Sequence, residues 1–102
     1  RRKDRAELGG VEIIAGPLFP EPELGWMLYE GFEGQGYATE AAAALRDWGL
    51  KVAGLDSLVS YFDPANARSI AVARRLGAVP DPRAPRQDPE DLVFRYHPAG
   101  EA

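Results

Sequence analysis

The sequence predicts an α/β or α+β fold in which a mixed sheet has a parallel strand pair at its centre. Segments rich in β-branched and aromatic residues alternate with two segments of helical periodicity, in the order β-β-α-β-α-β. The first helical segment joins two strands over roughly 25 residues, the length that a parallel crossover connection needs. A ligand site is therefore expected at the carboxyl ends of that parallel pair.

Two strands are predicted before the glycine-rich part of the chain. Residues 10–15, GVEIIA, alternate weakly and are rich in β-branched side chains, and residues 23–29, ELGWMLY, have the composition of a second strand. The segment between them, 16–22, contains three prolines and is predicted to be a turn. Because this connection is short, we expect the two strands to pair antiparallel.

The rest of the chain is predicted to hold two helices and two further strands. Gly54 and Gly77 each follow a segment of helical spacing and are expected to end it. The charged residues 1–7 are expected to be frayed, and 1–9 and 98–102 to be disordered parts of a single domain spanning 1–102. In order, the predicted elements are a helix at 38–52, a strand at 55–62, a helix at 66–76, a proline-rich loop at 80–89 and a strand at 92–96.

Composition narrows the classes of function. The 102 residues carry a formal net charge of −4, which argues against nucleic acid as a partner. The chain has no cysteine, which excludes disulfides and thiolate chemistry and favours the cytoplasm. No run of about 18 apolar residues is present, so no membrane partner is expected. A single histidine, His97, without clustered carboxylates predicts no metal site.

Glycines are concentrated between the second strand and the first helix, in the segment 30–37, EGFEGQGY. A helix N-terminus presents unpaired N–H groups, and glycines let the backbone approach a phosphate closely. The alternative is a glycine-rich turn that binds nothing. Neither the P-loop pattern nor G-x-G-x-x-G occurs, so the segment matches neither of those two phosphate motifs. A diphosphate would meet the consecutive amides of Gly34, Gln35, Gly36, Tyr37, Ala38 and Thr39.

Three motifs, in the right order, resemble those of the GNAT N-acetyltransferases. Residues 23–26 are ELGW, and residues 34–41 are GQGYATEA. A third motif, N-x-x-S-x-x-V-x-x-x-L-G, occupies residues 66–77. The sequence is most similar to the branch that includes the ribosomal-protein alanine acetyltransferases, and the resemblance covers about residues 10 to 96.

The resemblance implies acetyl-CoA as co-substrate, with no metal. The strand before the glycine loop would splay from its parallel neighbour, and its backbone at Trp26, Met27 and Leu28 would pair with the pantetheine arm. Pantetheine amides suit such an unpaired strand edge. Asn66 would contact the cofactor from the second helix. By the same resemblance, the pyrophosphate would bind the amides of Gln35, Gly36, Tyr37, Ala38 and Thr39.

The chain departs from the family pattern at two places. Glu33 stands where the family often has Arg or Gln, and a carboxylate directed at a pyrophosphate would repel it. A complete domain of this family also has a strand, one or two helices and another strand before the part seen here. The sequence therefore predicts a partial domain that lacks the N-terminal half, which usually supplies much of the acceptor pocket.

Two residues are candidates for the proton transfers of acetyl transfer to a primary amine by direct attack. Glu23, on the strand leading to the glycine loop, is the candidate general base; the alternative is an exposed strand-end carboxylate. Ser69 matches a serine of the resembled branch that is suited to protonating the CoA thiolate. Its alternative is a helix hydroxyl bonded to a nearby carbonyl. The tyrosine that serves as acid in other branches would fall at Ala73.

The sequence is also compatible with functions other than that of a complete N-acetyltransferase. The chain is alternatively a non-catalytic CoA-binding or interaction module derived from such a domain, or a fragment of a longer enzyme. The strand at 10–15 has no predicted neighbour on its far side, so its edge is expected to pair with another copy in a homodimer. Ribosomal N-termini, small amines and antibiotics all remain possible acceptors.

Overall fold

The structure is a computed structural model that describes residues 5–8, 10–16, 20–26 and 35–97, with only the backbone described at 5–8 and 35–38. These residues form one mixed sheet and two α-helices, the first continued by a short π-helix. The strands are β1 (Arg5–Leu8), β2 (Val11–Ile14), β3 (Glu23–Trp26), β4 (Val59–Phe62), β5 (Val79–Pro80) and β6 (Leu92–Arg95). The helices are α1 (Gln35–Asp47), the π-helix η1 (Trp48–Val52) and α2 (Ala67–Arg75).

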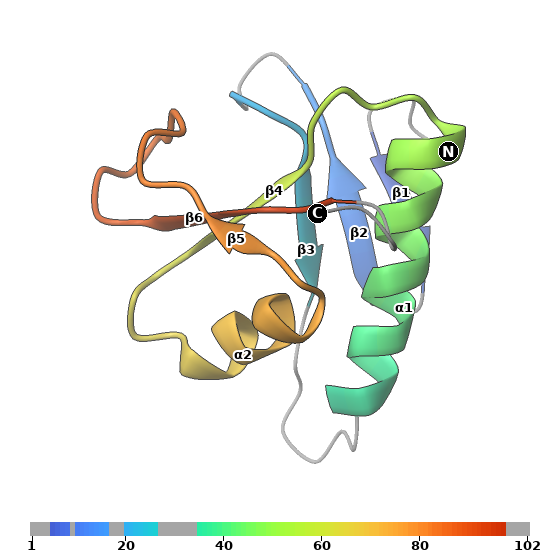
Figure 1. The fold of residues 1–102 in the computed structure, drawn as a ribbon, viewed down its shortest axis with the longest axis horizontal. Coiled ribbons are helices and arrows are strands. Elements are labelled where there is room, and N and C mark those ends of the chain that lie inside the picture. Colours follow the sequence, from blue (N-terminus) through green and yellow to red (C-terminus); the bar gives the residue numbers. More distant parts are fainter. Residues whose placement is uncertain (1–4, 9, 17–19, 27–34, 98–102) are drawn as a thin grey trace.

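The sheet has the strand order β1-β2-β3-β4-β6-β5. Its central pair, β3 and β4, is parallel, and every other neighbouring pair is antiparallel. Helix α1 lies between β3 and β4 in the chain, so it forms the crossover that a parallel pair requires. The mixed fold with a central parallel pair is therefore confirmed (Figure 1).

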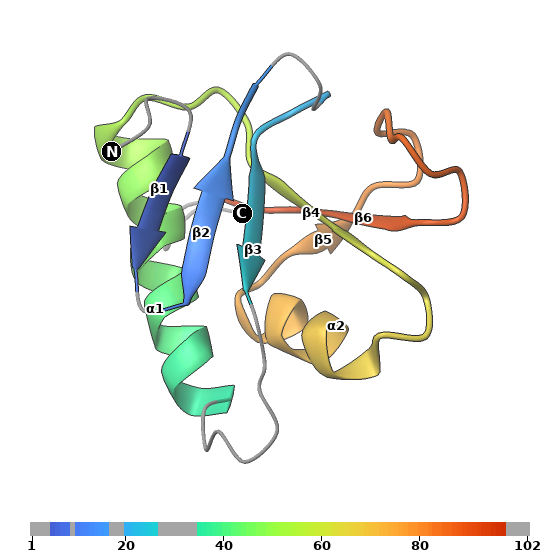
Figure 2. The same cartoon turned by 180° about the vertical axis from the view of Figure 1, so that it is seen from behind.

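The parallel pair is paired only at its root. Its register has a single partner pair, Glu23 with Val59, whereas β2 and β3 pair along four residues. Both views show β1, β2 and β3 aligned along a common axis with alternating directions, and β4 and β6 crossing that axis at a steep angle (Figures 1 and 2). The sheet is thus divided into two arms that meet at the start of β3 and diverge toward its end.

Helix α1 covers one face of the β1–β3 arm, and α2 packs against α1 and β4 (Figure 2). Ala41, Ala42 and Leu45 recur on the buried side of α1, as helical spacing requires. Arg46, almost fully buried, donates from Nη1 to the carbonyl of Leu76 at 2.8 Å and so links α1 to the end of α2. This helix-side core also contains Val11, Ile13, Leu24, Leu58, Phe62, Val72, Ala73, Phe94 and Tyr96.

The opposite face of the β4–β6 arm is covered by a loop, residues 81–91. Ala84 from this loop packs against Val59 and Val93, with Tyr61 partly buried beside them. The four prolines at 80–89 predicted a loop here, and that expectation is confirmed except at Pro80, which belongs to the two-residue strand β5.

One expectation about the N-terminus was wrong. The charged segment 1–7 was expected to be frayed, but β1 covers Arg5–Leu8 and pairs antiparallel with β2. Leu8 lies opposite Val11, so two glycines connect the strands, and Gly10 has a φ of 84°. A Gly-Gly pair favours a hairpin turn. The prediction of a frayed segment was based on its charge and did not take this pair into account. The strand at 10–15 therefore does have a neighbour on its far side.

Element boundaries differ from the predictions by a few residues. The first helix begins at Gln35 rather than at 38, and its final turn is the π-helix η1. The strand predicted at 55–62 is shorter, because only Val59–Phe62 pairs in the sheet. Gly54 and Gly77 have φ values of 77° and 78°, the left-handed conformation that ends a helix, which confirms both predicted stops.

Candidate functional site

The candidate site is the opening between the diverging ends of β3 and β4, here called the splay. At its root the backbone N–H of Val59 donates to the carbonyl of Pro22 at 3.1 Å. One residue further, the hydroxyl of Ser60 bridges the gap and donates to the carbonyl of Leu24. A side chain thus satisfies a carbonyl that a neighbouring strand would otherwise have paired.

Tyr96 completes this bridge. Its phenol oxygen lies 2.7 Å from the Ser60 oxygen, and Ser60 already donates to Leu24, so the phenol is the donor. Burial raises the pKa of Tyr96 well above its ordinary value of 10, which keeps the phenol protonated. Ser60 is fully buried, and both of its partners lie in the core. The root of the splay is therefore fixed by a buried chain of two hydrogen bonds.

On the helix side, α2 covers the diverging end of the splay. The indole Nε1 of Trp26, the last residue of β3, donates to the hydroxyl of Ser69 at 3.2 Å. Asn66 caps α2, with its side-chain oxygen accepting from the backbone N–H of Ser69 at 3.3 Å. The Trp26 ring lies 5.7 Å from that of Phe62, centroid to centroid, so aromatic contact fills the wedge between the arms.

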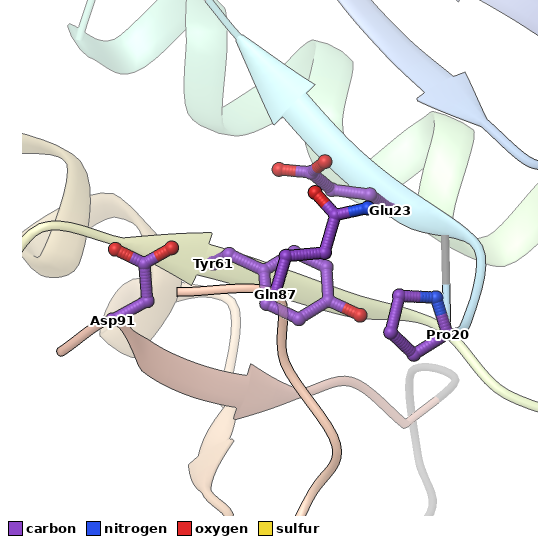
Figure 3. A pocket seen from close by; sticks show the side chains of 5 residues that line it. All are labelled: Pro20, Glu23, Tyr61, Gln87 and Asp91. Carbon is purple, nitrogen blue, oxygen red and sulfur yellow. The ribbon is translucent and has the colours of Figure 1, made fainter. Parts of the chain in front are cut away.

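A cavity of about 190 Å³ lies on the other face of the sheet. Leu24 and Trp26 belong to the helix-side core, so the alternation along β3 turns Glu23 to the opposite side. Figure 3 shows the side chains that line this cavity, which come from the turn before β3, from both central strands and from the 81–91 loop: Pro20, Glu23, Tyr61, Gln87 and Asp91.

The two carboxyl groups of the cavity have raised pKa values. Desolvation is the main cause for Glu23, and the negative charges of Asp91 and Glu12 add to it. A hydrogen bond from the backbone N–H of Tyr61 opposes the shift. Burial likewise raises the pKa of Asp91, with Asp88 and Asp63 contributing repulsion. Glu23 is thus a better proton acceptor at neutral pH than an ordinary surface carboxylate.

Tyr61 also lines the cavity that contains Glu23 and Asp91. Its phenol oxygen is buried and has no hydrogen-bond partner within the described part of the chain. Burial, then the charges of Glu21 and Glu23, raise its pKa; the nearby backbone N–H of Glu21 opposes this without reaching hydrogen-bond geometry. A buried, unpaired hydroxyl beside a cavity leaves room for a polar group of a ligand.

The structure brings some of the predicted site residues together and separates others. Trp26, Ser69 and Asn66 form one connected group on the helix side. Glu23 lies on the far face, so the two catalytic candidates flank the splay from opposite sides. Met27, Leu28, Glu33 and Gly34 lie outside the described residues.

The predicted pyrophosphate loop is described only in part. Gln35, Gly36, Tyr37 and Ala38 form the first turn of α1 in the backbone, and Thr39 is half-buried in the next turn. No acidic residue occurs in that first turn, which suits an anion. In Figure 1 the start of α1 lies below the end of β3, at the same end of the molecule as the diverging ends of the arms.

Sequence reasoning missed most of the cavity. Tyr61 stood in a predicted strand, but nothing in the sequence said which of its two faces would meet Glu23. Gln87 and Asp91 belong to the proline-rich loop, whose path depends on contacts with distant strands.

In the described ranges no group of three or more His, Cys, Asp or Glu residues could hold a metal ion. Nor does any helix in those ranges have the length and apolar character to cross a membrane.

A parallel pair that splays beside a helix N-terminus is an architecture suited to an acyl-CoA-dependent transferase. A family model described as "Acetyltransferase (GNAT) domain" matches residues 1–79. The chain belongs to the GNAT acetyltransferase family, which confirms the family resemblance of its motifs.

Individual relatives agree with this assignment. An acetyltransferase from Agrobacterium tumefaciens str. C58 is 63% identical with a TM-score of 0.80, over 85% of this chain and 51% of that one. The ribosomal-protein-S5-alanine acetyltransferase from Vibrio fischeri has the same fold, at 24% identity and a TM-score of 0.64, over 83% of this chain and 50% of that one. The uncharacterized N-acetyltransferase YnaD of Bacillus subtilis (strain 168) is 33% identical over 55 residues, 54% of this chain and 32% of that protein. The chain thus spans about half the length of these structural neighbours.

Proposed function

We propose that this chain is the acetyl-CoA-binding part of an N-acetyltransferase that transfers an acetyl group to a primary amine by direct attack. Family membership implies acetyl transfer. The observation that carries the finer proposal is the splay: a cavity with a raised-pKa carboxyl group lies on one face, and a helix N-terminus and a hydroxyl lie on the other. A thioester threaded between the arms would meet both.

The cofactor is proposed to bind at the start of α1 and along the free edge of β3. Acetyl-CoA supplies an acetyl group activated as a thioester. The amides of residues 35–39 would hold its pyrophosphate, because the first turn of a helix has unpaired N–H groups. The backbone of Trp26, Met27 and Leu28 would pair with pantetheine, and Asn66 would contact the cofactor from the end of α2.

The cavity is proposed to receive the acceptor amine. An amine is protonated in water, and the carboxyl groups of Glu23 and Asp91 would draw it in as a cation. Glu23 would first take a proton from the ammonium group, which frees the nitrogen lone pair to attack the thioester carbonyl carbon, and the nitrogen would lose its second proton to water as the amide forms. The raised pKa of Glu23 suits this task.

Ser69 is proposed to protonate the leaving sulfur. Because the indole N–H of Trp26 donates to the Ser69 oxygen, the hydroxyl hydrogen remains available for donation. When the carbon–sulfur bond breaks, Ser69 would pass this proton to the thiolate and recover one from water. The hydrogen bond from Trp26 would stabilise the serine oxygen during the transfer.

Calorimetry and turnover together test this function. We expect CoA to bind the native chain and Gly36→Glu to abolish binding, because a carboxylate in the first turn of α1 would repel the pyrophosphate. Ala44→Glu is the matched control, since it adds the same charge at an exposed position in the middle of α1. Equal binding by all three proteins, or by none, would refute the cofactor site.

Turnover is measured as release of the CoA thiol from acetyl-CoA, with propylamine and an N-terminal alanyl peptide as acceptors. Glu23→Gln should lower the rate by about 10²–10⁴, the usual contribution of a general base, and the exposed Glu40→Gln should not. CoA binding without turnover on any amine would instead favour the non-catalytic module. Restoring turnover by adding the preceding residues of a longer reading frame would identify the chain as a fragment of an enzyme.

We further propose a cytoplasmic homodimer. The edge of β2 no longer supports it, because β1 occupies that edge. The surface proposed for the dimer contact is instead the face of the β1–β3 arm opposite α1. Glu12 and Ile14 are only half-buried there, and the chain is about half as long as its structural neighbours. A second copy covering this face would stabilise each subunit.

A further inference from the structure

Arg86 makes an unusual set of contacts inside the 81–91 loop. Its side chain donates five hydrogen bonds, and all of them go to backbone carbonyls of the same loop. Nη1 donates to Asp91 at 2.7 Å, and Nε donates to Ala84 at 3.1 Å. Nη2 donates to Pro82 at 2.7 Å, Ala84 at 3.0 Å and Asp81 at 3.2 Å. Four carbonyls from both ends of the loop therefore converge on one guanidinium.

This arrangement explains how a proline-rich loop without regular pairing keeps a defined shape. The loop has few backbone hydrogen bonds of its own: Ala84 N–H donates to Asp81 and Asp91 N–H to Asp88. Carbonyls turned inward would otherwise lack donors, and a planar guanidinium satisfies several at once in fixed directions. A lysine ammonium has three donors at a single point and cannot span the same carbonyls.

The same loop forms one wall of the cavity that holds Glu23. Gln87 follows Arg86 directly, and Asp91 is the residue whose carbonyl receives the 2.7 Å bond from Nη1. Ala84, which accepts two of the five bonds, is buried against Val59 and Val93 and anchors the loop to the sheet. The contacts of Arg86 thus connect the anchored end of the loop to the end that lines the cavity.

We propose that Arg86 is a positioning residue of the acceptor site, holding the 81–91 loop in the shape that places Gln87 and Asp91 beside Glu23. The proposal rests on the proposed function in taking this cavity as the acceptor site. Arg86 does not act on the acceptor itself, since its donors are directed to the carbonyls of its own loop.

Three variants separate this role from a general effect on stability. Arg86→Lys keeps the charge and loses the planar set of donors, and Arg86→Gln loses both. Arg83→Gln is the matched control. Arg83 lies exposed in the same loop, and this substitution removes the same charge as Arg86→Gln. In both Arg86 variants, amide exchange at Ala84 and Asp91 should accelerate about tenfold, the ratio that corresponds to one or two lost hydrogen bonds.

The second readout is the titration of the Glu23 carboxyl carbon by NMR, followed in the folded protein. Burial has the largest effect on Glu23, followed by the backbone N–H of Tyr61 and the carboxylates of Asp91 and Glu12. The 81–91 loop supplies Asp91 and, with Gln87, lines the cavity beside Glu23. Release of the loop should therefore lower the pKa of Glu23 toward its ordinary value in Arg86→Lys, and Arg83→Gln should not show this fall. The third readout is binding of propylammonium chloride, compared with sodium chloride at equal ionic strength; its affinity should drop about tenfold in Arg86→Lys.

A lower melting temperature with an unchanged Glu23 titration and unchanged propylammonium affinity would overturn the proposal and leave Arg86 a purely structural residue. Asp91→Asn provides a second test in case the Arg86 variants fail to fold. It should lower both the pKa of Glu23 and the propylammonium affinity while leaving exchange at Ala84 unchanged, and no change in either quantity would remove Asp91 from the site. None of these readouts needs acetyl-CoA or turnover, so they stand apart from a failure of the proposed reaction.

Discussion

Replacing Ser60 by alanine tests how the splay is built. Ser60 is fully buried, donates to the carbonyl of Leu24 and accepts from the phenol of Tyr96. Alanine fills nearly the same volume, so packing changes little, but two buried polar groups lose their partner. Each such group costs about 1–3 kcal/mol when left unsatisfied, which gives an expected loss of about 2–6 kcal/mol in the free energy of unfolding.

Urea unfolding followed by circular dichroism measures this loss, with Tyr96→Phe and the double variant completing a double-mutant cycle. Tyr96→Phe leaves Ser60 bonded to Leu24, so it should cost only about 1 kcal/mol. The double variant should cost less than the sum of the two single variants, with a coupling energy of about 1 kcal/mol, because each single change affects the same chain of hydrogen bonds. A loss below about 0.5 kcal/mol in Ser60→Ala, the range of ordinary surface substitutions, would refute the view that this serine holds the arms together at their root.

Three further predictions concern the reaction, the pH dependence of stability, and the assembly. With an identified acceptor, Ser69→Ala should lower turnover by about 10²–10⁴ with little effect on CoA affinity, whereas Asn66→Ala should mainly weaken that affinity; an unchanged rate would remove Ser69 from the mechanism. Because the folded pKa of Glu23 is raised above 4.5, its charged form costs stability, so the stability of the native chain should rise as pH falls from above the folded pKa toward 4.5. Glu23→Gln should lose that rise, and pH-dependent urea midpoints with equal slopes in both proteins would contradict the burial of this charge. If the chain is a dimer, its melting temperature should rise over a hundredfold increase in concentration, and light scattering that gives a monomer throughout would exclude the dimer.

The sequence predicted the parts of the fold that local pattern controls. Helical spacing and a following glycine located both helices, and the crossover length located the parallel pair. The π-helix at the end of α1 could not be read in this way. It lets Gly49 approach the sheet so closely that a β-carbon there would lie 2.9 Å from the side chain of Ile13. Such a contact between distant segments leaves no periodic signal in the chain.

The residues of the candidate site likewise fall into those that the sequence predicted and those that it did not. Trp26, Asn66 and Ser69 were found because motif spacing locates them, and the structure connects them by hydrogen bonds. Tyr61 and Asp91 were missed because their meeting with Glu23 depends on the angle between the arms and on the path of the loop. Both depend on contacts made in three dimensions, and a sequence pattern carries information mainly about neighbours along the chain.

Contacts at both ends of the splay indicate that its width is set before any ligand binds. At the root, Arg95 on β6 forms a two-bond ion pair with Glu21 at 2.7 and 2.9 Å, just before β3, and also contacts Asp81 at 2.9 Å. Arg95 lowers the pKa of both carboxyl groups, so this connection between the arms persists at neutral pH. At the open end, Trp26 is bonded to Ser69 on α2. The ring of Trp26 also contacts that of Phe62 on β4. Because the two arms are thus in contact at both ends, a thioester entering between them would meet groups already in place, which reduces the cost of ordering them during the reaction.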